Sequence, residues 1–158
     1  MLNHHLKVNG QTIHAVEAGE GPAVLFLHGF PDTWRSWRRQ IEAVAAAGYR
    51  AVAIDLRGFG ESSVPAAIEA YTPLHIIGDC VAVLDSLEIS NAALVGHDFG
   101  ATTAWYAALV RPDRFRAVFG VSVPYDPPSL PNFLDQLSDA GHNQFYMFEQ
   151  MDPESDNL

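Results

Sequence analysis

The chain has 158 residues and a formal net charge of −10, with 9 Lys and Arg against 19 Asp and Glu, and 48% of its residues are hydrophobic. This length and apolar content are sufficient for one globular domain with a buried core. The acidic balance argues against binding to nucleic acid or to a membrane surface, because both need clustered Lys and Arg. No apolar run approaches the roughly 20 residues of a membrane span, and the N-terminus lacks the apolar core of a secretory signal. We therefore expect a cytoplasmic protein that acts on a small neutral molecule.

Short β-type runs alternate with longer helical stretches along the chain, which indicates an α/β domain. The first two runs read as an antiparallel pair joined at Asn9-Gly10, a dipeptide that accepts positive φ at low cost. Nearly continuous apolar runs then predict buried parallel strands at 23–27, 51–54, 92–96 and 117–123. Helical periodicity predicts the connections between them, at 33–47, 73–87 and 98–110.

The character of the sequence changes after Val123, where PYDPPSLPN holds four prolines in nine residues and cannot continue a strand or a helix. We therefore divide the chain into a core at 1–126 and a second segment at 127–158. The lone Cys80 excludes an internal disulfide and is expected to be a small buried hydrophobic residue on a helix.

The motif GHDFG places Asp98 between Gly96 and Gly100, directly between a predicted strand and a predicted helix. This context is typical of the sharp turn that presents a catalytic nucleophile. Such a turn strains the backbone of its central residue, and the glycines let strand and helix approach each other. The backbone N–H of Phe99, at the helix start, then points at developing negative charge. The alternative is that Asp98 only caps the helix, but a cap does not need both glycines.

An aspartate nucleophile predicts attack on a saturated carbon that bears a leaving group, because this gives a stable ester whereas attack on an ordinary ester gives a reactive anhydride. Water can then hydrolyse the ester if a general base activates it and an oxyanion hole receives the charge. The second amide of that hole is expected from HGFPD, where Pro31 restricts Phe30 and a cis bond would aim the Phe30 N–H inward. An ordinary turn rich in Gly and Pro is the alternative for this segment.

Five segments in this order and spacing resemble the epoxide hydrolases of the α/β-hydrolase fold: HGFPDTWRSWRRQI, DLRGFGESSVP, YTPLHIIGDCVAVLDSL, VGHDFGATTAWYAALVRPDRFRAV and VSVPY. The resemblance covers nearly all of residues 1 to about 126 and implies a mostly parallel sheet with flanking helices, incomplete here and followed by the start of a lid at 127–158. It implies that Asp98 is the nucleophile, that Phe30 and Phe99 supply the oxyanion-hole amides, and that an epoxide is opened to a vicinal diol without cofactor or metal. Haloalkane dehalogenases share the aspartate turn and are the nearest alternative. They typically carry Asn and Trp at the two positions held here by Phe30 and Phe99, which favours an epoxide.

The lid of such enzymes contributes tyrosines that hydrogen-bond the epoxide oxygen. The stretch FYMFEQMDPE resembles the segment that holds the first of them, although one residue is lost after Met147 and the usual Pro-Gly is replaced. Tyr146 is therefore the candidate proton donor to the leaving alkoxide, and a packing aromatic is the alternative. Trp34, with Phe30 and Phe99, is expected to form an apolar wall for a small apolar epoxide.

The family's catalytic histidine and its supporting carboxylate follow later strands that this sequence does not contain. His142 does not resemble that histidine, His97 is expected to point away from the nucleophile, and His28 is expected to brace the oxyanion loop. No spacing typical of a metal site is found among the other histidines, His4, His5, His14 and His75. Arg57 and Glu61 are expected to make structural contacts.

These features predict the N-terminal portion of a longer enzyme, whose remaining part would cover the edge strand at 117–123. Two alternatives stay open. The chain could form a homo-oligomer that covers the same edge, or it could be a non-catalytic binding fragment or pseudoenzyme that keeps the pocket without turnover.

Overall fold

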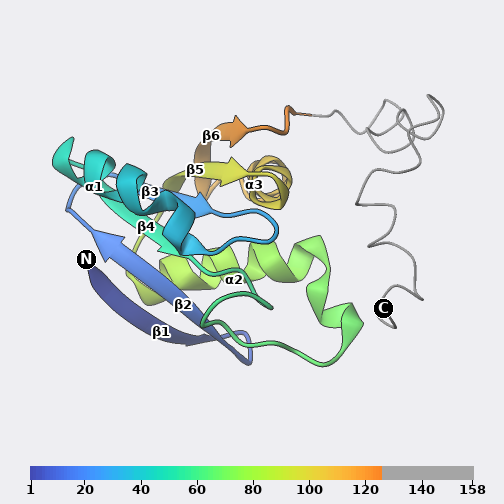
Figure 1. Ribbon diagram of the computed structural model, residues 1–158. Helices are drawn as coiled ribbons and strands as arrows, with labels where there is room; N and C mark the ends of the chain where they lie inside the picture. Colours follow the sequence, from blue (N-terminus) through green and yellow to red (C-terminus); the bar gives the residue numbers. More distant parts are fainter. Residues whose placement is uncertain (126–158) are drawn as a thin grey trace. The chain divides into compact units, whose positions relative to one another are not determined.

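The computed structural model describes residues 1–125, in which six strands form one sheet in the order β1-β2-β4-β3-β5-β6 (Figure 1). The strands are β1 (Leu2–Val8), β2 (Gln11–Ala18), β3 (Ala23–Leu27), β4 (Arg50–Ile54), β5 (Ala92–His97) and β6 (Phe115–Val121). The helices are α1 (Arg38–Ala46), α2 (Pro73–Ser86) and α3 (Phe99–Val110), with two 3-10 turns, η1 (Trp34–Trp37) and η2 (Ile68–Tyr71). The predicted lid segment, with Tyr146 and His142, lies outside the described residues.

The sheet is mixed and mostly parallel, as the sequence predicts. β1 and β2 form an antiparallel hairpin whose turn residues, Asn9 and Gly10, have φ values of 50° and 74°. Both central residues of a two-residue hairpin turn need such positive φ values. β2 pairs antiparallel with β4, and the pairs β3–β4, β3–β5 and β5–β6 are all parallel. The carboxyl ends of β3, β4 and β5 therefore meet at one edge of the sheet.

Helices cover both faces of the sheet because the strands are apolar on both sides. On one face, Leu25 and Leu27 of β3 share a core with residues of α2 and α3, such as Leu84 and Ala104. On the other face, Phe26 packs with residues of η1 and α1, including Trp37 and Ile41. Nearly continuous apolar runs are expected for strands buried in this way.

Several element boundaries differ from the predictions by one or two residues, and the largest difference is in the first predicted helix. The predicted helix at 33–47 begins as the 3-10 turn η1, because the Thr33 carbonyl accepts from the Ser36 N–H three residues on, and the α-helix starts only at Arg38. β6 starts at Phe115 and not at Ala117.

β6 is an edge strand of the described sheet, and its Phe119 side chain is 66% exposed. The prediction of an apolar edge strand is thus confirmed within the described part of the chain. None of the helices in residues 1–125 combines the length and apolar character that crossing a membrane requires.

Candidate active site

Asp98 lies in the sharp turn between the end of β5 and the start of α3. Its φ and ψ of 53° and −122° are a conformation that residues with a side chain rarely adopt. Its carbonyl accepts from the Ala101 and Thr102 N–H groups at 2.9 and 3.2 Å, which starts the helix, whereas its side chain makes no capping hydrogen bond. The Asp98 carboxylate therefore does not cap α3, and the alternative reading of Asp98 as a helix cap does not hold.

Glycines surround Asp98 because there is no room for a side chain. A Cβ atom on Gly96 would collide with the Gly100 carbonyl, and one on Gly100 would collide with the Leu27 carbonyl of β3. A Cβ on Gly29 would collide with the Cβ of Asp98 itself. The close approach of β3, β5 and α3 at this point thus depends on all three glycines.

The loop after β3 brings a main-chain amide to the Asp98 carboxylate. The Phe30 N–H donates to Asp98 Oδ1 at 2.9 Å, and the Phe30–Pro31 peptide bond is cis. This hydrogen bond orients the carboxylate relative to the loop after β3. Phe99 is the first residue of α3, so its N–H has no carbonyl partner four residues earlier within the helix. The structure therefore brings together Asp98, Phe30 and Phe99 at one edge of the sheet.

His28 braces this loop, as the sequence predicts. It is fully buried, and its Nε2 accepts from the Leu56 N–H at 3.0 Å, so Nδ1 carries the proton and donates to the Gly29 carbonyl at 2.8 Å. Burial lowers the pKa of His28, although the hydrogen bond to Gly29 and the charges of Asp55 and Asp32 act in the opposite direction. Both ring nitrogens are engaged, so His28 is a positioning residue and not a general base.

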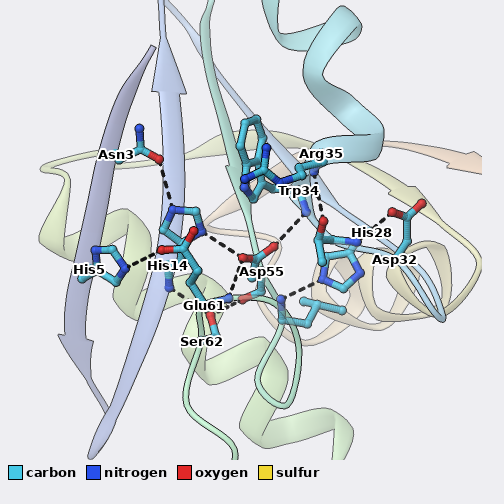
Figure 2. A network of polar contacts seen from close by, with 12 residues as sticks. Asn3, His5, His14, His28, Asp32, Trp34, Arg35, Asp55, Glu61 and Ser62 are labelled. Atoms are coloured by element: carbon cyan, nitrogen blue, oxygen red, sulfur yellow. Dashed lines mark hydrogen bonds and ion pairs between the residues drawn. The ribbon is translucent and has the colours of Figure 1, made fainter.

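Asp55, directly after β4, anchors the other end of the same loop (Figure 2). Its Oδ1 accepts from the Trp34 N–H at 2.8 Å, and its Oδ2 accepts from the Glu61 N–H at 3.0 Å. Oδ2 also lies 2.9 Å from His14 Nδ1, and both side chains are 1% exposed. Trp34 is thus fixed through its backbone, and its ring packs partly against the core cluster that contains Trp37. Its predicted contact with substrate stays a prediction.

Phe30 is 41% exposed beside Asp98 and has an aromatic neighbour that the sequence reasoning missed. The Phe59 ring lies edge-on to Phe30 with ring centroids 6.3 Å apart, and it also contacts His28 at 5.1 Å. Phe59 belongs to the loop that follows β4. Since β4 is adjacent to β3 and parallel to it, this position could have placed Phe59 at the same edge.

Arg57, in the same loop, makes the structural contacts that the sequence predicts. Its Nε and Nη2 donate to the two carboxylate oxygens of Asp79 on α2, each at 2.7 Å. Other guanidinium N–H groups donate to the carbonyls of Ala70 and His75. Arg57 therefore joins the loop after β4 to the helix α2 and to the turn before it.

A hollow of ≈ 490 Å³ opens at the opposite edge of the sheet, around the amino ends of β3 and β5. Its lining includes Pro22, Tyr49, Arg50 and Asn91, and none of the residues around Asp98. The hollow contains none of the residues of the nucleophile motif, whereas the edge with Asp98 combines the strained turn and the Phe30 amide. We therefore assign the candidate active site to the Asp98 edge and not to this hollow.

Comparison with known proteins identifies the family of the chain. The model of the alpha/beta hydrolase fold family matches residues 22–157. An epoxide hydrolase of Caballeronia sordidicola is 54% identical over 156 residues, which are 98% of this chain and 47% of that protein. Epoxide hydrolase 3 of Siraitia grosvenorii is 47% identical over 144 residues, or 90% of this chain and 45% of that protein.

Solved structures give the same result. The crystal structure of an epoxide hydrolase from Vigna radiata superposes with a TM-score of 0.86 at 44% identity, covering 96% of this chain and 50% of that one. An epoxide hydrolase from an endophytic Streptomyces gives a TM-score of 0.88 at 45% identity, covering 96% of this chain and 46% of that one. The chain thus spans about half the length of the relatives that it matches. The resemblance that the motifs predicted is confirmed, and the chain belongs to the alpha/beta hydrolase fold family, with its similarity to epoxide hydrolases extending over most of its length.

Proposed function

We propose that this chain carries the nucleophile and the oxyanion hole of an epoxide hydrolase, which opens a small apolar epoxide to a vicinal diol. The observation that carries the proposal is the 2.9 Å hydrogen bond from the Phe30 N–H to Asp98 Oδ1, at a turn where Asp98 has a φ of 53°. The epoxide hydrolases to which the chain is similar support the choice of an epoxide over other electrophiles.

In the first step Asp98 Oδ2 attacks an epoxide carbon, the carbon–oxygen bond of the ring breaks, and an ester forms. Oδ1 becomes the ester carbonyl oxygen while it keeps its bond to Phe30 N–H. The leaving alkoxide needs a proton, and Tyr146 is the proposed donor because a phenol can protonate an alkoxide. Phe30, Phe99 and Trp34 are proposed to surround the apolar part of the substrate.

In the second step water attacks the ester carbonyl carbon of Asp98, and the charge that develops on Oδ1 is stabilised by the amides of Phe30 and Phe99. The bond between this carbon and the substrate oxygen then breaks, a proton taken from the water passes to the leaving oxygen, and the diol is released with the carboxylate restored. This step needs a general base. His28 and His14 have both ring nitrogens in contact with other groups, His28 with Gly29 and Leu56, and His14 with Asp55 and Asn3. We therefore assign the base to a residue other than His28 and His14.

The intact mass of the protein after incubation with styrene oxide tests this proposal. We expect a mass increase equal to one styrene oxide, located on Asp98 by peptide mapping, with little diol released. Asp98→Asn should abolish the labelling, while the exposed control Asp113→Asn should be labelled like the parent chain.

Other outcomes have defined meanings in the same assay. Steady diol formation would show that the chain contains a base that is not assigned here. Halide release from a haloalkane, with no reaction of the epoxide, would favour a dehalogenase. Labelling that persists in Asp98→Asn would contradict the assigned nucleophile, and no labelling of the parent chain would favour a binding fragment.

A further inference from the structure

Three potential metal ligands meet on the side of Asp55 opposite to His28 (Figure 2). His5, His14 and Glu61 each offer one ligand atom, and these atoms all lie within 4.8 Å of one another (Figure 2). We propose that these residues bind a divalent transition metal ion, and that zinc suits their ligand set best. This inference is independent of the proposed epoxide chemistry, because none of the three residues is part of the nucleophile turn or the oxyanion hole.

Strand register and backbone hydrogen bonds fix the three residues next to one another. His5 of β1 and His14 of β2 are direct partners in the antiparallel hairpin, and their ring centroids are 5.0 Å apart. Glu61 arrives from the loop after β4, where its own N–H donates to Asp55 Oδ2. The next residue, Ser62, accepts from the His14 N–H at 2.9 Å and donates to the Asp55 carbonyl at 2.6 Å. The backbone positions of all three ligands are therefore set by the fold.

His14 already has the second partner that a metal-binding histidine usually needs. Its Nδ1 lies 2.9 Å from Asp55 Oδ2, and both side chains are 1% exposed. A carboxylate at one ring nitrogen fixes the ring orientation and the tautomer, so that the other nitrogen presents its lone pair to a metal. In His14 that other nitrogen is Nε2.

The environment of Nε2 favours a cation. Nε2 lies 3.2 Å from Asn3 Oδ1, which is a hydrogen-bond acceptor. When Nδ1 carries the proton that is donated to Asp55, Nε2 presents a lone pair beside this second oxygen. A metal ion bound by Nε2 and Asn3 Oδ1 together would use both lone pairs, so the proposed site includes Asn3 as its fourth ligand.

The ligand atoms of His5, His14 and Glu61 lie within 4.8 Å of one another, so the exposed side chains must move by up to about 1.5 Å to form a zinc site. Zinc binds nitrogen and oxygen at about 2.0–2.2 Å, so two ligands of a tetrahedral site lie roughly 3.3 Å apart. The pair His5 Nε2–Glu61 Oε2 is 3.1 Å apart, and the pair His14 Nε2–Asn3 Oδ1 is 3.2 Å apart. The His5 and Glu61 side chains are 52% and 56% exposed, so both can move to close the site around an ion.

The donor types select the metal. Two imidazoles and one carboxylate suit zinc, and nickel and copper bind the same types of donor. Magnesium and calcium prefer all-oxygen sites. A bound ion would join β1 to the loop after β4 and, through His14 and Asp55, to the Trp34 N–H. We therefore expect binding to stabilise the fold, since a ligand that binds only the folded state raises its stability.

The test is a calorimetric titration of the untagged full chain with ZnCl2 after treatment with a chelator. We expect one saturable site and a higher melting temperature with zinc, but not with magnesium. His5→Ala and Glu61→Gln should each weaken zinc binding by about 10-fold or more, because loss of a ligand costs at least as much as loss of an outer partner. Both side chains are exposed, so the variants should fold, which circular dichroism checks.

His75→Ala and Glu42→Gln are the matched controls, because they remove an exposed imidazole and an exposed carboxylate elsewhere. Both should bind zinc like the parent chain. Substitution with Co2+ adds a readout of geometry, since a four-coordinate nitrogen and oxygen site gives a strong visible band that a hydrated surface ion lacks. The proposal is overturned if the parent chain shows no saturable zinc binding, or if His5→Ala and Glu61→Gln bind as tightly as the controls.

Discussion

The buried ion pair between Arg57 and Asp79 offers a sharp test of how the loop after β4 is held. The two side chains are 2% and 3% exposed, and two N–H groups of Arg57 donate to the two oxygens of Asp79, each at 2.7 Å. Asp79→Asn keeps the shape of the side chain but removes its charge and replaces one acceptor oxygen with an NH2 donor. One guanidinium N–H then faces another donor, and the Arg57 charge stays buried without a counterion.

The size of the effect follows from these contacts. Loss of one hydrogen bond to a charged group costs about 1.5–3 kcal/mol, and breaking a buried ion pair by removing one partner costs about 3–5 kcal/mol in total. Small domains have free energies of unfolding of about 5–15 kcal/mol. The substitution should therefore remove a large part of the stability of the chain without changing its fold.

Urea unfolding followed by circular dichroism measures this effect. With an m-value of about 2 kcal/mol/M, the expected loss lowers the urea midpoint of Asp79→Asn by roughly 2 M. Asp113→Asn is the control, because Asp113 also forms an ion pair with an arginine, Arg111, but at the exposed surface. It should unfold at the midpoint of the parent chain.

A second variant tests whether the unpaired charge of Arg57 causes the loss of stability in Asp79→Asn. The double substitution Arg57→Met with Asp79→Leu removes both charges, so it should regain much of the stability that Asp79→Asn loses. The reasoning is refuted if Asp79→Asn has the same midpoint as Asp113→Asn, or if the double variant is less stable than Asp79→Asn.

Three further predictions concern single residues. Gly96→Ala places a Cβ against the Gly100 carbonyl and should lower the free energy of unfolding by about 1–3 kcal/mol. In the control Gly78→Ala in α2, the new Cβ meets only Asn9 Nδ2, at 3.6 Å, so the free energy of unfolding should rise by roughly 0.5–1 kcal/mol. Equal urea midpoints for the two variants would contradict the close approach at the turn. Burial raises the pKa of the Cys80 thiol to about 12, so a maleimide should label it only after unfolding in urea, and rapid labelling of the native chain would argue against its burial. Burial lowers the pKa of His28, so below about pH 6.5 the unfolded chain takes up a proton that the folded chain resists, and the free energy of unfolding should fall by up to about 1.4 kcal/mol per pH unit. His28→Asn should reduce the dependence of the free energy of unfolding on pH, measured by urea unfolding between pH 5 and 7. An unchanged dependence would exclude His28 as its source.

The sequence was sufficient to predict those parts of the fold that depend on neighbouring residues. Asn9-Gly10 is read directly as a tight turn because both residues need a positive φ there. The strands were found because each is an apolar run that is covered on both faces. Asp98 could be identified for a related reason, since the close approach of β5 and α3 requires glycine at both flanking positions, Gly96 and Gly100, which are visible in the local sequence.

Contacts between distant segments were not predictable in the same way. The partners Arg57 and Asp79 are 22 positions apart, His14 and Asp55 are 41 apart, and His5 and Glu61 are 56 apart. The histidines of β1 and β2 show no metal-ligand spacing along the chain. They meet because the register of the hairpin pairs His5 with His14, and Glu61 joins them only because its loop returns to Asp55.

The position of the Phe30 amide, which is proposed for the oxyanion hole, depends on hydrogen bonds at both ends of its loop. The loop that carries Phe30 is held at its start by His28, through Gly29 and Leu56, and at its end by the bond from the Trp34 N–H to Asp55. Phe30 lies between these two anchors, so its N–H has little freedom to move away from Asp98 Oδ1. Because a displacement of about 1 Å in a reacting group can cost about 100-fold in rate, rigidity of this kind is itself a catalytic requirement. Asp55, which follows β4, therefore helps to hold the Phe30 amide beside Asp98, and a metal ion on His14 would act on the same anchor through Asp55.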